Sequence, residues 1–111
     1  MPAAPAAESV FGAIACATRR ELLDALIRRE RSVTELVEIL GVSQPAVSQH
    51  LKVLREAKLV TERREGRFRF YRLHARPLRE VMRWVKHYER FWDERLARLG
   101  RVLDEMKGRD A

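Results

Sequence analysis

The chain has 111 residues, of which 46% are hydrophobic and 35% are charged. This length accommodates one compact domain, or one domain with a long appended helix, and the apolar fraction excludes a disordered chain. A formal net charge of +7 implies an anionic partner, because such an excess of Lys and Arg repels itself unless phosphates or similar groups neutralise it.

Neither a membrane span nor a secretion signal is expected. No apolar run approaches the roughly 20 residues that cross a bilayer. Residues 1–7 read as a disordered tail without the features of a signal peptide, so we expect a cytoplasmic protein. The single cysteine, Cys16, excludes an internal disulfide and every zinc site that is built on several cysteines.

Two short helices are expected before residue 28. Residues 8–15 place Val10, Phe11 and Ile14 at helical spacing. A second helix is expected to begin at a capping box formed by Thr18 and Glu21. The residues of this helix that should face a core are Leu22, Leu23, Leu26 and Ile27. The charged run 28–31 is expected to be a solvated connector.

Residues 32–59 predict two amphipathic helices joined by a tight turn. Ser32 and Glu35 have the spacing of a capping box, and Gly41 can take the left-handed conformation that ends a helix. Ser43 can cap the next helix, whose first turn tolerates Pro45. A helix, a short glycine-containing turn and a second helix are typical of the helix-turn-helix of DNA-binding proteins.

The outer face of the second helix is polar and carries few charges. It lies opposite the apolar residues and consists of Pro45, Gln49, Lys52 and Glu56, flanked by Ser48 and Arg55. Gln can pair bidentately with adenine, and Ser can hydrogen-bond to several base edges. The face therefore favours base recognition, and the alternative is the solvated side of a helix in a small bundle.

Beyond Leu59 the apolar spacing becomes that of extended chain. Residues 60–64 and 67–73 flank Glu65 and Gly66, which predicts a β-hairpin with the glycine at its tip. Arginines crowd this tip, where they could contact phosphates or enter the minor groove. Such a hairpin after a helix-turn-helix is the wing of a winged helix; the alternative is a basic edge that prevents aggregation between sheets.

These stretches resemble the ArsR/SmtB family of bacterial winged-helix transcriptional repressors. The resemblance is carried by ATRRELL at 17–23, VSQPAVSQHLKVL at 42–54 and the hairpin at 59–73. It implies a mainly α fold with a small β-hairpin, a DNA-binding domain over residues 8–75, and a homodimer that represses transcription from an inverted-repeat operator. The expected DNA-contacting residues are Ser43, Gln44, Ser48, Gln49, His50, Lys52, Arg63, Arg64, Arg67 and Arg69. The role of His50 comes from the resemblance alone, since it could instead pack or touch a phosphate.

Many members of this family sense metals, and the sequence departs from their ligand patterns. The arsenic and cadmium sites use a cysteine pair in the first helix of the motif, where residues 34–38 offer no thiol. His50, His74 and His87 lack the spacing of the zinc site. We therefore expect the subgroup without an evident metal site, with no metal and no cofactor. A metal- or redox-responsive repressor of the same family is the alternative. Cys16 is either a small packing residue or a site of oxidation.

The last third of the chain predicts one long amphipathic helix. Pro77 lies in its first turn, and apolar residues recur at alternating threes and fours through Met106. At about 1.5 Å per residue such a helix is longer than the winged domain can cover, so we assign residues 76–108 to dimerisation. Gly100 is a weak point where the helix could bend or end early. The expected interface residues are Phe11, Val81, Val85, Tyr88, Trp92, Leu96 and Leu99. An apolar ligand pocket is the alternative use of the aromatic residues there.

Two other classes of function have less support. An enzyme is not expected, because the sequence has no nucleophile–base pair, phosphate-binding glycine loop or metal-ligand set. A winged-helix module that binds proteins would favour an acidic or apolar recognition face. Ser48, Gln49 and Lys52 do not fit that expectation.

Overall fold

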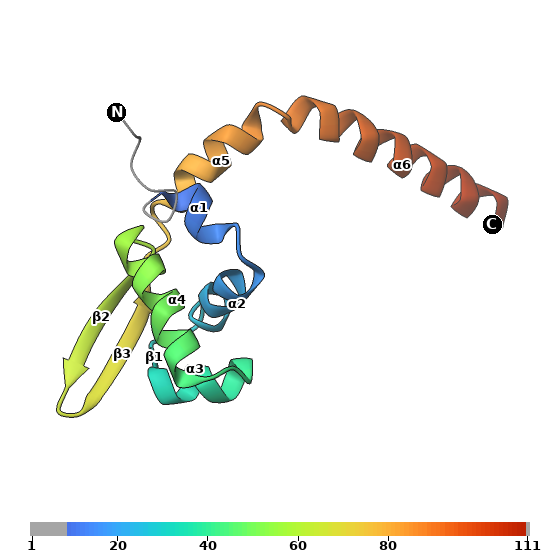
Figure 1. Ribbon diagram of the computed structural model, residues 1–111. Coiled ribbons are helices and arrows are strands. Elements are labelled where there is room, and N and C mark those ends of the chain that lie inside the picture. Colours follow the sequence, from blue (N-terminus) through green and yellow to red (C-terminus); the bar gives the residue numbers. More distant parts are fainter. Residues whose placement is uncertain (1–8, 111) are drawn as a thin grey trace, which may run out of the picture. The chain divides into compact units, whose positions relative to one another are not determined.

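The computed structural model describes residues 9–110 and divides the chain into two compact units, Met1–Val81 and Met82–Ala111 (Figure 1). The expected tail at residues 1–7 lies outside the described residues. The first unit contains α1 (Val10–Ile14), α2 (Ala17–Ala25), β1 (Arg31–Ser32), α3 (Val33–Leu40), α4 (Gln44–Glu56), β2 (Val60–Glu65) and β3 (Phe68–Leu73). Two further helices follow, α5 (Leu78–Lys86) and α6 (Glu89–Asp110).

The expected start and stop signals delimit α3 and α4. The Ser32 hydroxyl accepts a hydrogen bond from the Glu35 amide at 3.2 Å, and the Glu35 carboxylate accepts one from the Ser32 amide at 3.3 Å. Gly41 ends α3 at φ 69°, and the Ser43 hydroxyl caps α4 by accepting from the Ala46 amide at 3.3 Å. The helix-turn-helix is therefore confirmed.

The predicted capping box of α2 is wrong. The helix begins at Ala17, and its N-cap residue is Cys16, whose side chain makes no capping hydrogen bond. Because the Arg20 amide already bonds to the Cys16 carbonyl at 3.1 Å, Thr18 lies inside the first turn and cannot take the extended conformation of an N-cap. At the other end α2 stops at Ala25, so Ile27 lies outside it and is 65% exposed, not in the core.

The expected hairpin is present, but it belongs to a three-stranded antiparallel sheet with the order β1-β3-β2. Gly66 takes φ 59° at the tip, where a left-handed conformation is required. The strand β1 was not predicted, since two residues show no periodicity. Arg31 pairs with Tyr71, and its Nε donates to the Ala25 carbonyl at 2.6 Å. The run 28–31 is therefore not solvated throughout.

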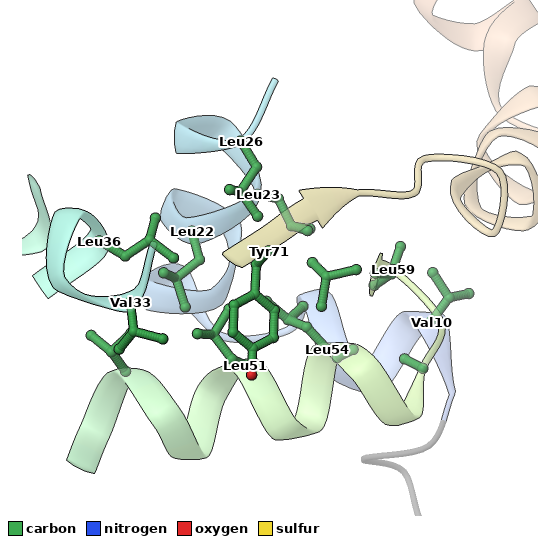
Figure 2. Packing of buried hydrophobic residues seen from close by; sticks show 14 residues of the cluster. Val10, Leu22, Leu23, Leu26, Val33, Leu36, Leu51, Leu54, Leu59 and Tyr71 are labelled. Atoms are coloured by element: carbon green, nitrogen blue, oxygen red, sulfur yellow. The ribbon is translucent and has the colours of Figure 1, made fainter. Parts of the chain in front are cut away.

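The core of the first unit fixes the position of α4. Val47, Leu51 and Leu54 of this helix are fully buried against residues of α2, α3 and the sheet. Figure 2 shows the ring of Tyr71 among the buried leucines. Burying a side chain such as leucine stabilises a fold by about 1.5–3 kcal/mol. The polar face of α4 is therefore presented from a rigid support.

The C-terminal end of α4 contains a strained residue. Lys58 follows the C-cap residue and takes φ 63°, a left-handed conformation that glycine adopts most easily. The Lys58 amide bonds to the Arg55 carbonyl at 2.9 Å, and the Leu59 amide bonds to the Leu54 carbonyl at 2.9 Å. This is the hydrogen-bond pattern of a Schellman motif, which turns the chain from α4 into β2.

The long C-terminal helix is present, but the prediction that it is continuous from Pro77 is wrong. It is interrupted at His87 and Tyr88, between α5 and α6. The His87 amide bonds to the Trp84 carbonyl at 3.1 Å, and the ring Nδ1 of His87 also lies 3.0 Å from that oxygen. That carbonyl is the one that would accept from the Tyr88 amide in an α-helix, so the regular pattern is lost there. By contrast, α6 runs through Gly100 without a break.

The apolar residues of these helices differ in exposure. Val81 is partly buried against the core of the first unit. Farther along, Tyr88 and Trp92 are both 49% exposed, Leu96 is 64% exposed and Leu99 is 53% exposed. We call Val85 and these four residues the seam. No helix in the described part of the chain is long and apolar enough to span a membrane.

Candidate nucleic-acid interface

A polar groove of about 300 Å³ lies between α4 and the β2–β3 hairpin, which are neighbours in the fold (Figure 1). We call it the hairpin groove. Its lining residues are Pro45, Ser48, Gln49, Lys52 and Arg55 from α4, and Glu62, Arg64, Arg69 and Tyr71 from the hairpin. Five of the ten residues expected to contact DNA therefore line one concave surface: Ser48, Gln49, Lys52, Arg64 and Arg69.

The α4 side of the groove presents short polar side chains on the exposed face. Gln49 and Lys52 are exposed, and Ser48 is half-buried. Ser43 and Gln44 are exposed at the start of the helix, although the Ser43 hydroxyl is engaged in capping. Hydrogen-bonding groups at the N-terminal half of such a helix are suited to contact base edges in a major groove.

The strand register decides which hairpin arginines face the groove. Arg64 pairs with Arg69, and Glu62 pairs with Tyr71, so these side chains share one face of the hairpin. That face is turned toward α4, since Arg69 Nη2 donates to the Ser48 hydroxyl at 3.4 Å. Two cationic side chains thereby line the groove opposite Gln49 and Lys52.

Arg63 lies on the other face of the hairpin. Its guanidinium donates to Glu30 at 2.6 and 3.2 Å and to Glu65 at 2.7 Å, and it sits 4.6 Å from the centre of the Phe70 ring. The hydrogen bonds to Glu30 and Glu65 raise the pKa of Arg63, and Arg63 lowers the pKa of Glu30. The structure therefore does not bring Arg63 to the hairpin groove. Arg67 is exposed at the hairpin tip, next to Gly66.

Glu62 is a carboxylate at the centre of this cationic surface. It accepts hydrogen bonds from Arg55 Nη1 at 2.7 Å, Arg64 Nε at 2.9 Å and the Tyr71 hydroxyl at 2.8 Å. The hydrogen bond from Arg64, followed by that from Tyr71, holds the pKa of Glu62 below its ordinary value. Burial, followed by the bond to Glu62, raises the pKa of Tyr71. One side chain thus connects α4 with both strands of the hairpin.

Comparisons with known proteins identify this architecture. The family model described as bacterial regulatory protein, arsR family, matches residues 16–62. The transcriptional repressor SdpR of Bacillus subtilis is 31% identical over 80 residues, which cover 72% of this chain and 89% of that protein. The chain belongs to the ArsR family.

Further relatives extend the match across most of the chain. The HTH-type transcriptional regulator Rv2034 of Mycobacterium tuberculosis is 39% identical over 97 residues, covering 87% of this chain and 88% of that protein. The solved structure of an ArsR-like transcriptional regulator from Rhodococcus sp. RHA1 superposes with a TM-score of 0.67 at 32% identity, covering 90% and 92% of the two chains. The winged helix-turn-helix is confirmed, and the protein is a DNA-binding transcriptional regulator. Its relatives are regulators and not enzymes.

In the winged helix-turn-helix of this ArsR-family protein, α4 occupies the position of the recognition helix and the β2–β3 hairpin occupies that of the wing. The sequence did not single out Glu62 or Tyr71 as parts of the interface. A signal was available for Glu62, since an acid two residues before Arg64 on a strand must share its face. Its link to Arg55 depends on tertiary packing and has no counterpart in local sequence.

His50 faces the opposite side of the recognition helix from the groove. Its Nδ1 lies 3.4 Å from Arg19 Nη1, and Arg19 donates to the carbonyls of Ala13 at 2.6 Å and Gly12 at 3.2 Å. Desolvation, followed by the nearby Arg19 charge, lowers the pKa of His50. Arg19 therefore links α1 to the recognition helix through His50, a contact that favours the packing role for this histidine.

Among residues 9–110 no group of three or more His, Cys, Asp and Glu side chains is arranged to hold a metal ion. Cys16 is half-buried and its thiol is not in a disulfide. The hydrogen bond from the Arg19 backbone is the main cause that lowers the pKa of this thiol. Whether Cys16 is a small packing residue or a site of oxidation therefore stays a prediction.

Proposed function

We propose that this protein represses transcription in the cytoplasm as a homodimer bound to an inverted-repeat operator. In each protomer the recognition helix enters the major groove, with Gln49 and Ser48 at base edges and Lys52 at the backbone. Arg64, Arg67 and Arg69 of the wing contact phosphates or the adjacent minor groove. The observation that supports this proposal is the hairpin groove, which brings polar side chains suited to base edges and arginines suited to phosphates onto one surface.

DNA binding and dimerisation are assigned to different parts of the chain. Residues 8–75 bind DNA in this proposal, and residues 76–108 hold the dimer together. Support for the second role comes from the seam, whose large apolar side chains are about half exposed in a single chain. An exposed apolar stripe of this extent favours association, and the same stripe on a second copy is its simplest partner. Phe11 is 37% exposed and is proposed to join this interface.

A dimer is also what operator geometry requires. One recognition helix covers a single half-site, and two copies that read the same face of the duplex must be about 34–36 Å apart, or one helical turn. The helices α5 and α6 supply the length for such a bridge. With Val81 anchored to its own core, we propose that Val85 and the residues after it make most of the contacts with the second protomer.

The test is a binding experiment on DNA from upstream of the protein's own gene, with a scrambled duplex of the same length as control. We expect two chains per duplex in sedimentation and a preference for the upstream DNA of about 10³-fold or more. Inserting about 5 bp between the half-sites should abolish that preference, because it turns one half-site to the opposite side of the helix. One chain per duplex, or an insertion without effect, would contradict the dimer. Equal affinity for both duplexes, extending to DNA selected from a random pool, would contradict operator recognition.

A further inference from the structure

We propose that Glu62 is a specificity-determining positioning residue: it locks the wing to the recognition helix and fixes Arg55 and Arg64 before DNA arrives. This inference rests on the proposed role of the hairpin groove in reading DNA. In this proposal a partly buried acid, on a surface that otherwise attracts phosphates, helps the protein to discriminate one DNA sequence from others.

The geometry makes Glu62 the junction of three secondary-structure elements. Its Oε2 accepts from Arg55 of α4 and from the hydroxyl of Tyr71 on β3, while its Oε1 accepts from Arg64 on its own strand. The Glu62 side chain is only 10% exposed, and its bond to Tyr71 is partly buried, while its bonds to Arg55 and Arg64 lie at the exposed edge of the groove. A carboxylate offers about four acceptor positions, and three of them are filled by donors within the protein.

The charge of Glu62 carries a cost on this surface. A negative group beside the phosphate backbone weakens binding to every sequence, and binding to random DNA depends almost entirely on such charges. Arg55 and Arg64 are each paired with Glu62, at 2.7 and 2.9 Å, so part of their charge is neutralised. The carboxylate therefore lowers affinity for random DNA.

This loss of affinity is offset because Glu62 orders two arginine side chains before DNA binds. Arg55 and Arg64 are 48% and 72% exposed, and long exposed side chains lose rotamer freedom when DNA immobilises them. With both guanidiniums already held by Glu62, this loss is incurred on folding. Because α4 and the wing are then held at a fixed angle, the phosphate contacts of the arginines determine which base Gln49 meets. DNA that cannot make the phosphate contacts and the Gln49 base contact at the same time binds less tightly.

The chain supplies a matched control in Glu65. It lies on the same strand, carries the same charge and pairs with Arg63, at 2.7 Å. It is 69% exposed, lies on the face away from the groove and has no hydrogen bond to α4 among those described. Replacing Glu65 therefore changes the charge of the wing without releasing the wing from the recognition helix.

The experiment measures two affinities for each variant over a salt series. One duplex is selected from a random-sequence pool by the wild-type protein, and the other is a scramble of the same composition. For Glu62→Gln we expect affinity for the scramble to rise about threefold and the salt slope to steepen by about one. The ratio of selected to scrambled affinity should fall by about fivefold or more. Glu65→Gln should leave that ratio unchanged.

A second variant separates positioning from charge and from folding. Tyr71→Phe keeps the buried ring and every charge but removes one of the three bonds to Glu62, so we expect a smaller fall in the ratio with an unchanged salt slope. Thermal unfolding of each variant shows whether the fold persists. The proposal is overturned if Glu62→Gln shifts both affinities by one factor, or if Glu65→Gln loses discrimination equally. Should the wild type select no sequence at all, the proposed function fails as well.

Discussion

Removing Trp92 should dissociate the proposed dimer without unfolding the winged domain. Trp92 is 49% exposed in the single chain, so about half of its roughly 250 Å² of surface is free to be buried by a second copy. At about 25 cal/mol per Å² this is about 3 kcal/mol per chain, or about 6 kcal/mol for a symmetric dimer. Such bookkeeping gives upper values. We therefore expect Trp92→Ala to cost about half of this upper value, about 3 kcal/mol, which weakens the dimer about 100-fold.

Sedimentation over a nanomolar to micromolar concentration series measures this change, and binding to the selected duplex measures its consequence for DNA. Phe91→Ala is the matched control, because Phe91 is 53% exposed on the same helix but lies off the seam and packs against Arg95, at 4.4 Å. The core of the first unit lies within residues 10–81, so circular dichroism should show it folded in both variants. A Trp92→Ala protein that sediments as a dimer and binds DNA normally would refute the seam as the interface.

Three further predictions concern stability and regulation. Lys58→Gly should raise the free energy of unfolding by about 0.5–1 kcal/mol, because removing the left-handed backbone strain at φ 63° outweighs the greater conformational entropy that glycine gives the unfolded chain. Urea unfolding measures this change. Lys58→Ala should show no gain, and equal gains for the two variants would contradict the strain. Because the pKa of Glu62 is lowered in the folded protein, its contribution to stability is complete above the ordinary carboxyl pKa and is lost as pH falls through the folded value. Glu62→Gln should therefore flatten the decline of the free energy of unfolding below pH about 4.5. Parallel wild-type and variant curves of unfolding free energy against pH would contradict this prediction. Zinc, cadmium and arsenite at low micromolar concentration should not release the protein from DNA, because no three His, Cys, Asp or Glu side chains among residues 9–110 are arranged to hold a metal ion. Metal-induced release that a chelator reverses would contradict this prediction.

The helix-turn-helix was predictable because its signals are local. A capping box, a glycine and a serine cap act within a few residues, and each is found where the pattern placed it. The hairpin followed for the same reason, from alternation around Gly66. The failure at Thr18 shows the limit of such signals, since a capping-box spacing does not state whether the chain is already helical before it.

What the sequence could not show depends on contacts between distant residues. The pairing of Arg63 with Glu30 spans 33 positions, and the bond between Arg55 and Glu62 depends on how the wing turns back on α4. All four wing arginines therefore seemed equivalent, although the register places Arg64 and Arg69 in the groove and Arg63 outside it. The interruption at His87 was equally hidden, because neither glycine nor proline marks it in the sequence.

The central claim is that the exposed face of α4 reads bases while the wing binds the backbone, and the variants Gln49→Ala and Arg67→Ala test it most directly. Both residues are exposed, and neither bonds to Glu62. Gln49→Ala should lose about 1–3 kcal/mol on the selected duplex and almost nothing on its scramble, because only a base contact is removed. Arg67→Ala should weaken both and reduce the salt slope by about one. If Gln49→Ala weakened both duplexes by the same factor, α4 would not be the element that reads the sequence.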